Sequence, residues 1–305
     1  MHALLTETAV TYDGPPPMLL AGSSESAFRK ARETAAASGL RIGGEVGISA
    51  ARNRLRQQAS ASAIWVELDE DCGPELDALL DEVDSLVESR RTGAVVSIDS
   101  SLIDRLSSRL FDSPAQFFVD VGPVERAASL ATATAVAAAP DRANDVSSDP
   151  GAERLRQLSD EVSRIAATLA RLSTVPVSAE PELRKPVDGD VPDVSVETVR
   201  SVIRARRLRA RFFAEDLFAD PAWDMLLDLL QAEISQLRVP VSSLCIAAAV
   251  PATTALRWLK SMTDKGLFVR RADPHDGRRV FVELSSHANM AMRRYFAEVG
   301  RPATI

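Results

Sequence analysis

Short apolar runs alternate with amphipathic stretches over the first 138 residues of the chain. The apolar runs occupy residues 17–21, 40–46, 63–68, 93–98 and 115–120. The stretches between them show helical spacing, at 24–38, 49–60, 74–90 and 101–110, with a fifth from Val124. Runs that are apolar on both faces and separated by helices are typical of a parallel sheet covered on both sides.

The order of these elements predicts the fold class of the N-terminal part. Five strand–helix units fit an α/β domain with a flavodoxin-like, doubly wound sheet. We expect this domain to span residues 17–138, after an N-terminal tail of residues 1–16. No G-x-G-x-x-G fingerprint follows a predicted strand, and Gly22 stands alone after the first one, so we expect no cofactor.

The segment 151–173 has a different period. Its apolar residues recur at alternating intervals of three and four, the a and d positions of a coiled coil: Leu155, Leu158, Val162, Ile165, Leu169 and Leu172. We expect this helix to pair with its copy in a homodimer. A helix that packs on its own domain has the same stripe, and this alternative stays open. Residues 174–195 combine prolines with charged residues and are predicted to be a linker.

The remaining residues, 196–305, predict a helical domain that contains a hairpin before its last helix, an α+β fold. A basic helix spans 196–213, and Asp220 is a candidate N-cap for a helix that begins at Pro221. Ser242 or Ser243 is expected to cap a third helix, which extends through Ala249. A fourth helix begins at Pro251, and the last runs over about 288–299.

The fourth helix divides into two faces at 100° per residue. One face carries Ala252, Ala255, Leu256, Leu259, Met262 and Thr263. The other face carries Thr253, Thr254, Arg257, Lys260, Ser261 and Asp264. The first suits a core, and the second offers hydroxyls and cations to a polyanion. Lys265 and Gly266 end the helix, and we expect Gly266 in the left-handed conformation.

A hairpin with a charged tip follows this helix. Its strands are LFVRR and RRVFVELS, its loop is ADPHDG, and Asp276-Gly277 is predicted to form the turn. Four arginines gather around it: Arg270, Arg271, Arg278 and Arg279. Helix, turn, helix and hairpin together predict a winged helix-turn-helix, whose guanidinium groups suit a phosphate backbone or a narrow minor groove. The alternative for each cation is a solvated surface side chain.

The charge of the chain is divided between its two ends. After residue 195 there are 17 Lys and Arg against 12 Asp and Glu, a net +5, and the rest of the chain carries −12. This asymmetry suits a nucleic-acid binder with a separate regulatory domain. We expect a cytoplasmic protein, because the N-terminus lacks signal-peptide features and no apolar run approaches the roughly 20 residues of a membrane span. Cys72 and Cys245 form no metal pattern and are expected to be small packed side chains.

The stretch TTALRWLKSMTDKGLFVRRADPHDGRRVFVELS resembles the recognition helix and wing of MarR-type transcriptional regulators. The features it shares are the Lys-Gly-Leu step, Arg270, the DPHDGRR wing and the strand that ends at Leu284-Ser285. The resemblance covers roughly residues 200–300 and implies a homodimer that binds double-stranded DNA. By position it assigns the major groove to Thr253, Thr254, Arg257 and Lys260, and the minor groove to Arg278 or Arg279. Family members usually have long terminal helices for dimerisation, so here the basic helix and the heptad segment would supply more of the dimer.

The N-terminal part resembles the receiver domain of two-component response regulators in its order of elements. That family needs acids after the first strand, an acceptor Asp after the third and a Lys after the fifth. Here Gly22 is followed by serines, the third strand ends in Glu67 and Asp69, and Asp120 stands where the Lys would be. We therefore expect a degenerate, non-catalytic receiver-like domain that serves regulation, dimerisation or contact with another regulatory protein.

Together these patterns predict a DNA-binding transcriptional regulator that is not an enzyme and binds no metal. A second hypothesis is a protein-interaction module whose winged helix contacts protein. A third, a nucleotide- or ligand-processing enzyme in the N-terminal part, is disfavoured because no nucleophile–base pair is evident there.

Overall fold

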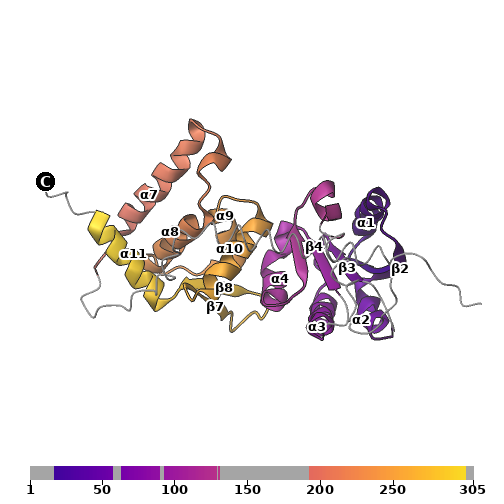
Figure 1. The fold of residues 1–305 in the computed structure, drawn as a ribbon. Helices are drawn as coiled ribbons and strands as arrows, with labels where there is room; N and C mark the ends of the chain where they lie inside the picture. The colour runs from indigo at the N-terminus through magenta and orange to yellow at the C-terminus, as the bar shows by residue number, and fades with distance from the viewer. Residues whose placement is uncertain (1–16, 58–62, 90–92, 129, 131–191, 300–305) are drawn as a thin grey trace, which may run out of the picture. The chain divides into compact units, whose positions relative to one another are not determined.

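The computed structural model describes residues 17–57, 63–89, 93–128, 130 and 192–299 (Figure 1). The described residues on either side of 131–191 belong to one compact unit. The six heptad residues between Leu155 and Leu172, and most of the predicted linker, lie outside the described residues. The coiled coil and its role in dimerisation therefore stay predictions.

Five strands form the sheet of the N-terminal part: β1 (Met18–Gly22), β2 (Ile42–Gly47), β3 (Ala63–Leu68), β4 (Gly93–Ile98) and β5 (Gln116–Val119). Each strand pairs in parallel with its neighbours, in the order β2-β1-β3-β4-β5. The predicted parallel five-stranded sheet is confirmed.

The central strands are buried on both faces of this sheet. In β3, Ile64 faces one core cluster and Trp65 faces the other, and each is at most 1% exposed. The helix α1 (Glu25–Ser38) packs on the Trp65 side, and Figure 1 shows it opposite α2 and α3. The helices α2 (Ile48–Gln57), α3 (Pro74–Glu88) and α4 (Ile103–Leu110) pack on the Ile64 side. Helices on both faces explain why the strands read as continuous apolar runs.

Residues 192–299 form five α-helices and a small antiparallel sheet. The helices are α7 (Val196–Leu208), α8 (Pro221–Ile234), α9 (Val241–Ala247), α10 (Ala252–Asp264) and α11 (Ser286–Val299). The strands β6 (Val239–Pro240), β7 (Phe268–Ala272) and β8 (Val280–Leu284) are arranged in the order β6-β8-β7. This is the arrangement of a winged helix-turn-helix, with α9 and α10 as the helix pair and β7–β8 as the wing.

None of the described helices is by itself long and apolar enough to cross a membrane. The pair α9 and α10 reaches the required length and composition only together, across a bend of 107°.

The basic helix is shorter than the predicted 196–213, because α7 ends at Leu208. A 3₁₀ turn (Arg209–Arg211) follows, in which the Arg209 carbonyl accepts from the amides of both Phe212 and Phe213. A second 3₁₀ turn (Glu215–Phe218) then places the rings of Phe213 and Phe218 edge to face at 5.5 Å. Arg209 lies 5.0 Å from the Phe218 ring centroid. Local aromatic packing therefore replaces the last turn of the predicted helix.

The predicted serine cap of α9 is wrong. The N-cap is Pro240, which offers no side-chain hydrogen bond, and α9 begins at Val241. Ser242 instead bonds to Asp104, a residue of α4. The helix also ends before Ala249, whose positive φ of 53° turns the chain towards α10.

The connection from α10 to the wing is fixed by Gly266, as the sequence predicts. Its φ is 68°, which is the left-handed conformation. Two hydrogen bonds of the Schellman type close the end of the helix. The amide of Gly266 donates to the Thr263 carbonyl and that of Leu267 to the Met262 carbonyl, both at 2.9 Å. The wing therefore leaves the helix at a defined angle.

Replacing Gly266 with alanine should lower the free energy of unfolding by about 1 kcal/mol, because a Cβ disfavours the left-handed conformation. Urea denaturation of the full chain measures the change. Gly277→Ala is the matched control: Gly277 has no positive φ, and an added Cβ there meets no atom within 4 Å. Equal effects of the two substitutions would contradict this account of the helix end.

Candidate nucleic-acid interface

The helix α10 has the two faces that its sequence predicts. Ala255, Leu256, Leu259 and Met262 are 0–4% exposed and belong to the core. The opposite side carries the candidate DNA-contacting residues Thr253, Thr254, Arg257, Lys260 and Ser261. The apolar face fixes the helix, and the polar face is left for contacts with other groups.

Two aspartates shape the loop at the tip of the wing. The Asp273 carboxylate accepts from the His275 amide at 2.9 Å, and the Asp276 carboxylate accepts from the Arg278 amide at 3.0 Å. The amide of Arg279 donates to the Asp276 carbonyl at 2.9 Å, which closes a turn. Gly277 and Arg278 are the central residues of this turn, so the chain turns at Asp276-Gly277 as the sequence predicts, although Gly277 has no positive φ. The two aspartates hold the loop between Ala272 and Val280.

Three of the four candidate arginines, Arg271, Arg278 and Arg279, are exposed on the wing, and the first and last of them form ion pairs within it. Arg271 lies 3.6 Å from a Glu283 oxygen, and Arg279 lies 3.6 Å from an Asp276 oxygen. Their side chains are 65% and 62% exposed. Ion pairs this exposed contribute about 0–1 kcal/mol, so both guanidinium groups can exchange partners easily.

Two residues of the polar face of α10 bond to the α/β part. The hydroxyl of Thr253 accepts a hydrogen bond from the Val119 amide of β5 at 2.9 Å. Nζ of Lys260 donates to the carbonyl of Phe111, just after α4, at 3.0 Å and lies 5.6 Å from the Phe111 ring centroid. Figure 1 shows α4 and α10 as neighbours, and α10 contacts β5.

Arg270, at the base of the wing, is the most enclosed of the four wing arginines. Its side chain is 18% exposed, and Nη2 donates to the Ser107 carbonyl at 2.6 Å. Nη1 donates to the Asp112 carboxylate at 3.1 Å, and the guanidinium carbon lies 3.8 Å from the Phe111 ring centroid. Burial lowers the pKa of Arg270, and the Asp112 carboxylate offsets only part of this effect. Arg270 therefore binds the α/β part through a hydrogen bond, an ion pair and a cation–π interaction at once.

A further contact caps α9 with a residue of α4. The Asp104 carboxylate accepts from the Ser242 amide at 2.8 Å and from the Ser242 hydroxyl at 2.6 Å. A carboxylate at a helix N-terminus satisfies a free N–H group and complements the helix dipole. No local pattern links two residues 138 positions apart, so sequence reasoning missed Asp104.

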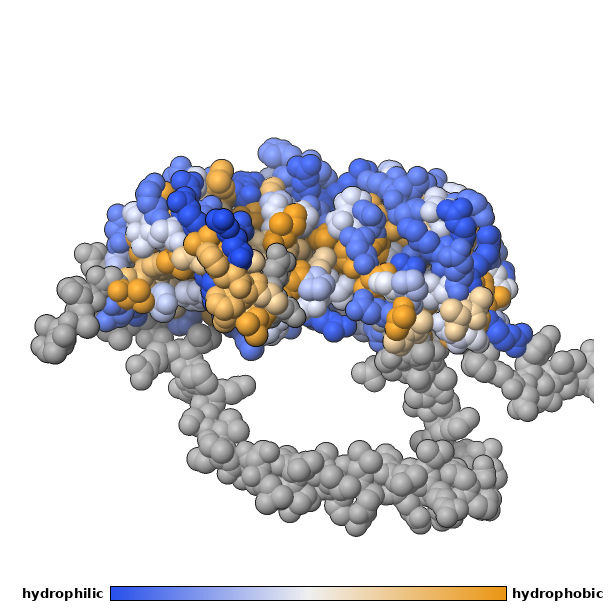
Figure 2. All heavy atoms as spheres, turned by 90° about the horizontal axis from the view of Figure 1, so that it is seen from above, coloured by the Kyte–Doolittle hydropathy of each residue, from blue (hydrophilic) through white to orange (hydrophobic). Residues whose placement is uncertain are grey.

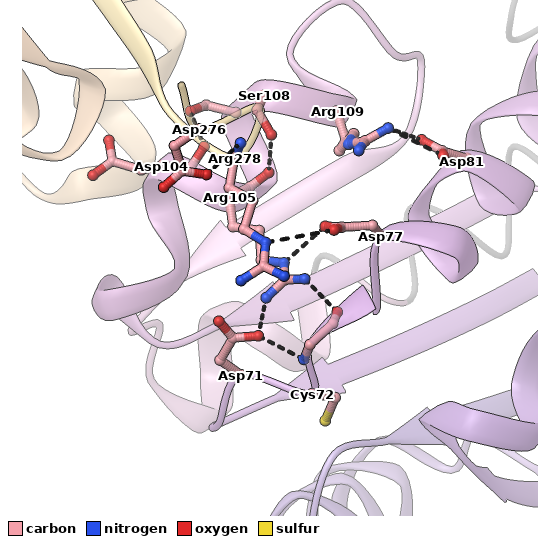
Figure 3. A network of polar contacts seen from close by, with 12 residues as sticks. Asp71, Cys72, Asp77, Asp81, Asp104, Arg105, Ser108, Arg109, Asp276 and Arg278 are labelled. Atoms are coloured by element: carbon pink, nitrogen blue, oxygen red, sulfur yellow. Dashed lines mark hydrogen bonds and ion pairs between the residues drawn. The ribbon is translucent and has the colours of Figure 1, made fainter. Parts of the chain in front are cut away.

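Arg278 reaches a polar network on the α/β part, shown in Figure 3. Its Nε lies 3.8 Å from an Asp77 oxygen. Asp77 also accepts a 2.8 Å hydrogen bond from Arg105, whose side chain is 5% exposed. Arg105 in turn donates to the Asp71 carboxylate and to the Gly73 carbonyl. Burial disfavours the charge of Arg105, but Asp77 and Asp71 outweigh it and raise its pKa.

The polar residues at the carboxyl end of the parallel sheet form a separate group. The Asp69 carboxylate accepts from the hydroxyls of Ser23 and Ser24, each at 2.7 Å. Burial raises the pKa of Asp69, but these hydrogen bonds outweigh it and the net pKa is lowered. Asp120 has a φ of 49°, and the described residues contain no group of three His, Cys, Asp or Glu suited to a metal ion.

Glu67 lies two residues before Asp69, and its pKa shifts in the opposite direction. It is 4% exposed, and burial raises its pKa although Arg126 lies 3.5 Å away. The Trp65 indole donates to its carboxylate at 3.1 Å. The buried carboxylate therefore costs stability once it is ionised.

Glu67→Gln should gain stability over the wild type as the pH rises. The folded pKa exceeds the usual 4.5, so the wild type loses stability above pH 4.5 as the unfolded chain releases a proton that the folded chain retains. The glutamine variant keeps an acceptor for Trp65 and has no charge to lose. Urea denaturation at pH 4 and pH 8 measures the difference between variant and wild type.

Glu82→Gln on α3 is the control of opposite sign. A hydrogen bond from Arg56 lowers the pKa of Glu82, so its ionised form contributes stability above pH 4.5 that is lost as the pH falls. This variant should be less stable than the wild type at pH 8, and the gap should shrink at low pH. A Glu67→Gln variant whose stability follows the wild type at every pH contradicts the buried-charge account.

Comparison with known proteins gives a partial match. No family model and no curated protein matches the sequence. In solved structures, 35% of the chain is similar to 76% of a point mutant of MarR from E. coli, at 16% identity and a TM-score of 0.23. The transcriptional regulator Tm0710 from Thermotoga maritima gives 20% identity and a TM-score of 0.21, over 34% of this chain and 75% of that one. BpsR from Bordetella bronchiseptica gives 21% identity and a TM-score of 0.21, over 33% of this chain and 80% of that one. At these identities and TM-scores the likeness establishes no family.

Proposed function

We propose that this protein is a DNA-binding transcriptional regulator whose winged helix contacts duplex DNA. One observation carries the proposal: α10 buries an apolar face, presents hydroxyls and cations on the other, and is joined by Gly266 to a hairpin that bears four arginines. An α-helix fits the major groove of B-DNA, and a hairpin beside it reaches the flanking backbone or minor groove. The resemblance of this stretch to MarR-type regulators points to the same function.

The proposed contacts divide into two kinds. Thr253, Thr254, Arg257, Lys260 and Ser261 would face base edges and nearby phosphates in the major groove. Arg278 or Arg279, at the tip of the wing, would enter the minor groove, while Arg270 and Arg271 at its base would contact phosphates. Arg257 is exposed on the polar face, which makes it the best candidate for reading a base.

The α/β part is proposed to be a receiver-like domain with a regulatory or dimerising role and no catalysis. The strand order β2-β1-β3-β4-β5 supports this, because it is the order of one common doubly wound fold. Asp69 is bonded to two serine hydroxyls, and Asp120 occupies the place where a receiver has its lysine. A phosphoryl group on Asp69 would therefore lack the lysine that a receiver places after its fifth strand.

A homodimer is proposed from large apolar side chains that are exposed on the surface of the described residues. Those at the end of α7 and in the turns after it are Leu208, Phe212, Phe213 and Leu217, which are 44%, 72%, 54% and 64% exposed. In Figure 1 this end of α7 lies at the top of the molecule. Figure 2 shows the molecule from above, with orange hydrophobic residues among blue hydrophilic ones on that face. Exposed clusters of this kind commonly mark interfaces. A dimer with two α10 helices would bind a roughly palindromic site.

A second function, a protein-interaction module, is favoured by the contacts that α10 already makes. Thr253 and Lys260 bond to backbone atoms of a protein segment, so this face can also recognise a polypeptide. The dependence of the binding affinity on salt concentration distinguishes the two functions. Phosphate contacts make the affinity fall steeply with salt, by a slope of about 0.9 per contact on logarithmic axes.

Alanine at Arg278 should weaken binding to all duplexes and reduce the salt slope by about 1, because a phosphate or minor-groove contact is lost. Alanine at Arg257 should also reduce the discrimination between a preferred site and random duplex, by about 1–3 kcal/mol. Fluorescence anisotropy with genomic fragments and random duplexes measures both effects across a salt series.

Arg54→Ala is the matched control, since Arg54 is an exposed arginine on α2 and its loss changes the net charge equally. If Arg278→Ala and Arg257→Ala both bind like this control, the assignment of the interface is wrong. If no genomic fragment binds more tightly than random duplex at moderate salt, the protein is not a sequence-specific regulator.

A further inference from the structure

Part of the proposed DNA-binding face is already occupied in this structure. Thr253, Lys260, Arg270 and Arg278 each have a partner on the α/β part of the compact unit. The three cations among them bond to oxygen acceptors, which are backbone carbonyls and carboxylates. Phosphate oxygens are acceptors of the same kind, so the α/β part and a duplex would compete for the same donors.

The surface that makes these contacts is compact and is called the α4–β5 face below. It comprises Asp104, Ser107, Phe111, Asp112 and Val119. It belongs to the acidic part of the chain, which carries −12 before residue 196 against +5 after it. The charge difference between the two ends thus favours this contact as well as DNA.

Apolar packing lies beneath the polar contacts. Leu256 of α10 lines a narrow apolar pocket together with Leu106, Leu110 and Phe117. One core cluster extends from the α2–α3–α4 side of the sheet into the winged helix. Phe111 is only 2% exposed and lies under the Arg270 guanidinium. The α4–β5 face therefore forms a packed interface, and its separation would expose apolar surface.

A duplex and the α4–β5 face cannot contact α10 at the same time. Thr253 stands in the first turn of α10 and Lys260 in the third, and both are bonded to this face. A helix in the major groove is enclosed by two phosphate backbones about 12 Å apart, which leaves no room for a sheet and a helix against the same side. Binding to one surface requires release from the other.

From these contacts we propose that the α4–β5 face is an autoinhibitory surface that covers the recognition helix and wing base until the two parts separate. The inference rests on the proposed DNA-binding function and adds its regulation. The structure is then the closed, DNA-free form. Only the open fraction of molecules binds DNA, so the apparent Kd rises in inverse proportion to that fraction.

The first test weakens the interface by substitutions that leave every residue proposed to contact DNA unchanged. Asp104→Ala together with Asp112→Ala removes the cap on Ser242 and the carboxylate partner of Arg270 and Lys260. The double variant should bind a genomic fragment about tenfold more tightly than the wild type, by fluorescence anisotropy. Glu75→Ala with Glu88→Ala is the control: it removes two exposed carboxylates from the same part and should leave the affinity unchanged within about twofold.

The second test locks the interface and does not depend on the release variant being well folded. Cysteines at Asp104 and Ser242, whose side-chain oxygens lie 2.6 Å apart, should form a disulfide on oxidation. The oxidised chain should lose DNA binding, and reduction should restore it. In the wild type, addition of duplex should speed hydrogen exchange of the Val119 amide, because Thr253 no longer accepts its hydrogen bond.

The outcomes separate the two proposals. If wild type, release variant and locked variant all bind duplex equally, autoinhibition is wrong and the DNA-binding function stands. A release variant that binds more weakly than the control overturns autoinhibition as well. If neither the wild type nor the release variant binds any duplex, while hydrogen exchange shows the Val119 amide freed in the variant, the DNA-binding function itself is wrong.

Discussion

A guanidinium that is largely withdrawn from water requires acceptors, and Arg270 finds them on the α/β part of the chain. The Ser107 carbonyl, the Asp112 carboxylate and the Phe111 ring surround it, and its Nε still lacks a partner among the described residues. Such a group is costly to leave unsatisfied, so its partners can be exchanged but not simply removed. This one requirement connects the base of the wing, the end of α4 and the face of α10 into a single arrangement.

Most of the local structure could be predicted from sequence, because its causes are local. The central strands β1, β3 and β4 are apolar on both faces, and α10 shows a period that separates Leu256 and Leu259 from Arg257 and Lys260. Gly266 could be assigned the left-handed conformation because a two-faced helix ended directly before it. In each case the residues that decide the structure lie within a few positions of one another.

The sequence predictions were wrong at positions whose structure depends on a residue far away in the sequence, or where two local conformations compete. Arginines, leucine and alanine after residue 203 all favour helix, yet the packing of Phe213 on Phe218 ends α7 at Leu208. Ser242 is a good cap residue by type, but its hydroxyl is engaged by a carboxylate from α4. The contact between the α4–β5 face and the winged helix could not be predicted from the sequence, in which only the opposite charges of the two ends of the chain pointed to it.

The hydrogen bond between Thr253 and Val119 also has a meaning for the sheet itself. The strand β5 is the last in the order β2-β1-β3-β4-β5, so its outer backbone groups have no neighbouring strand among the described residues. One of those outer groups is the Val119 amide, and the threonine hydroxyl covers it. A strand edge left uncovered is a template for pairing with another chain, which leads to self-association. The helix α10 thus covers this part of the strand edge, and a separation of the two would leave the Val119 amide to bond to water instead.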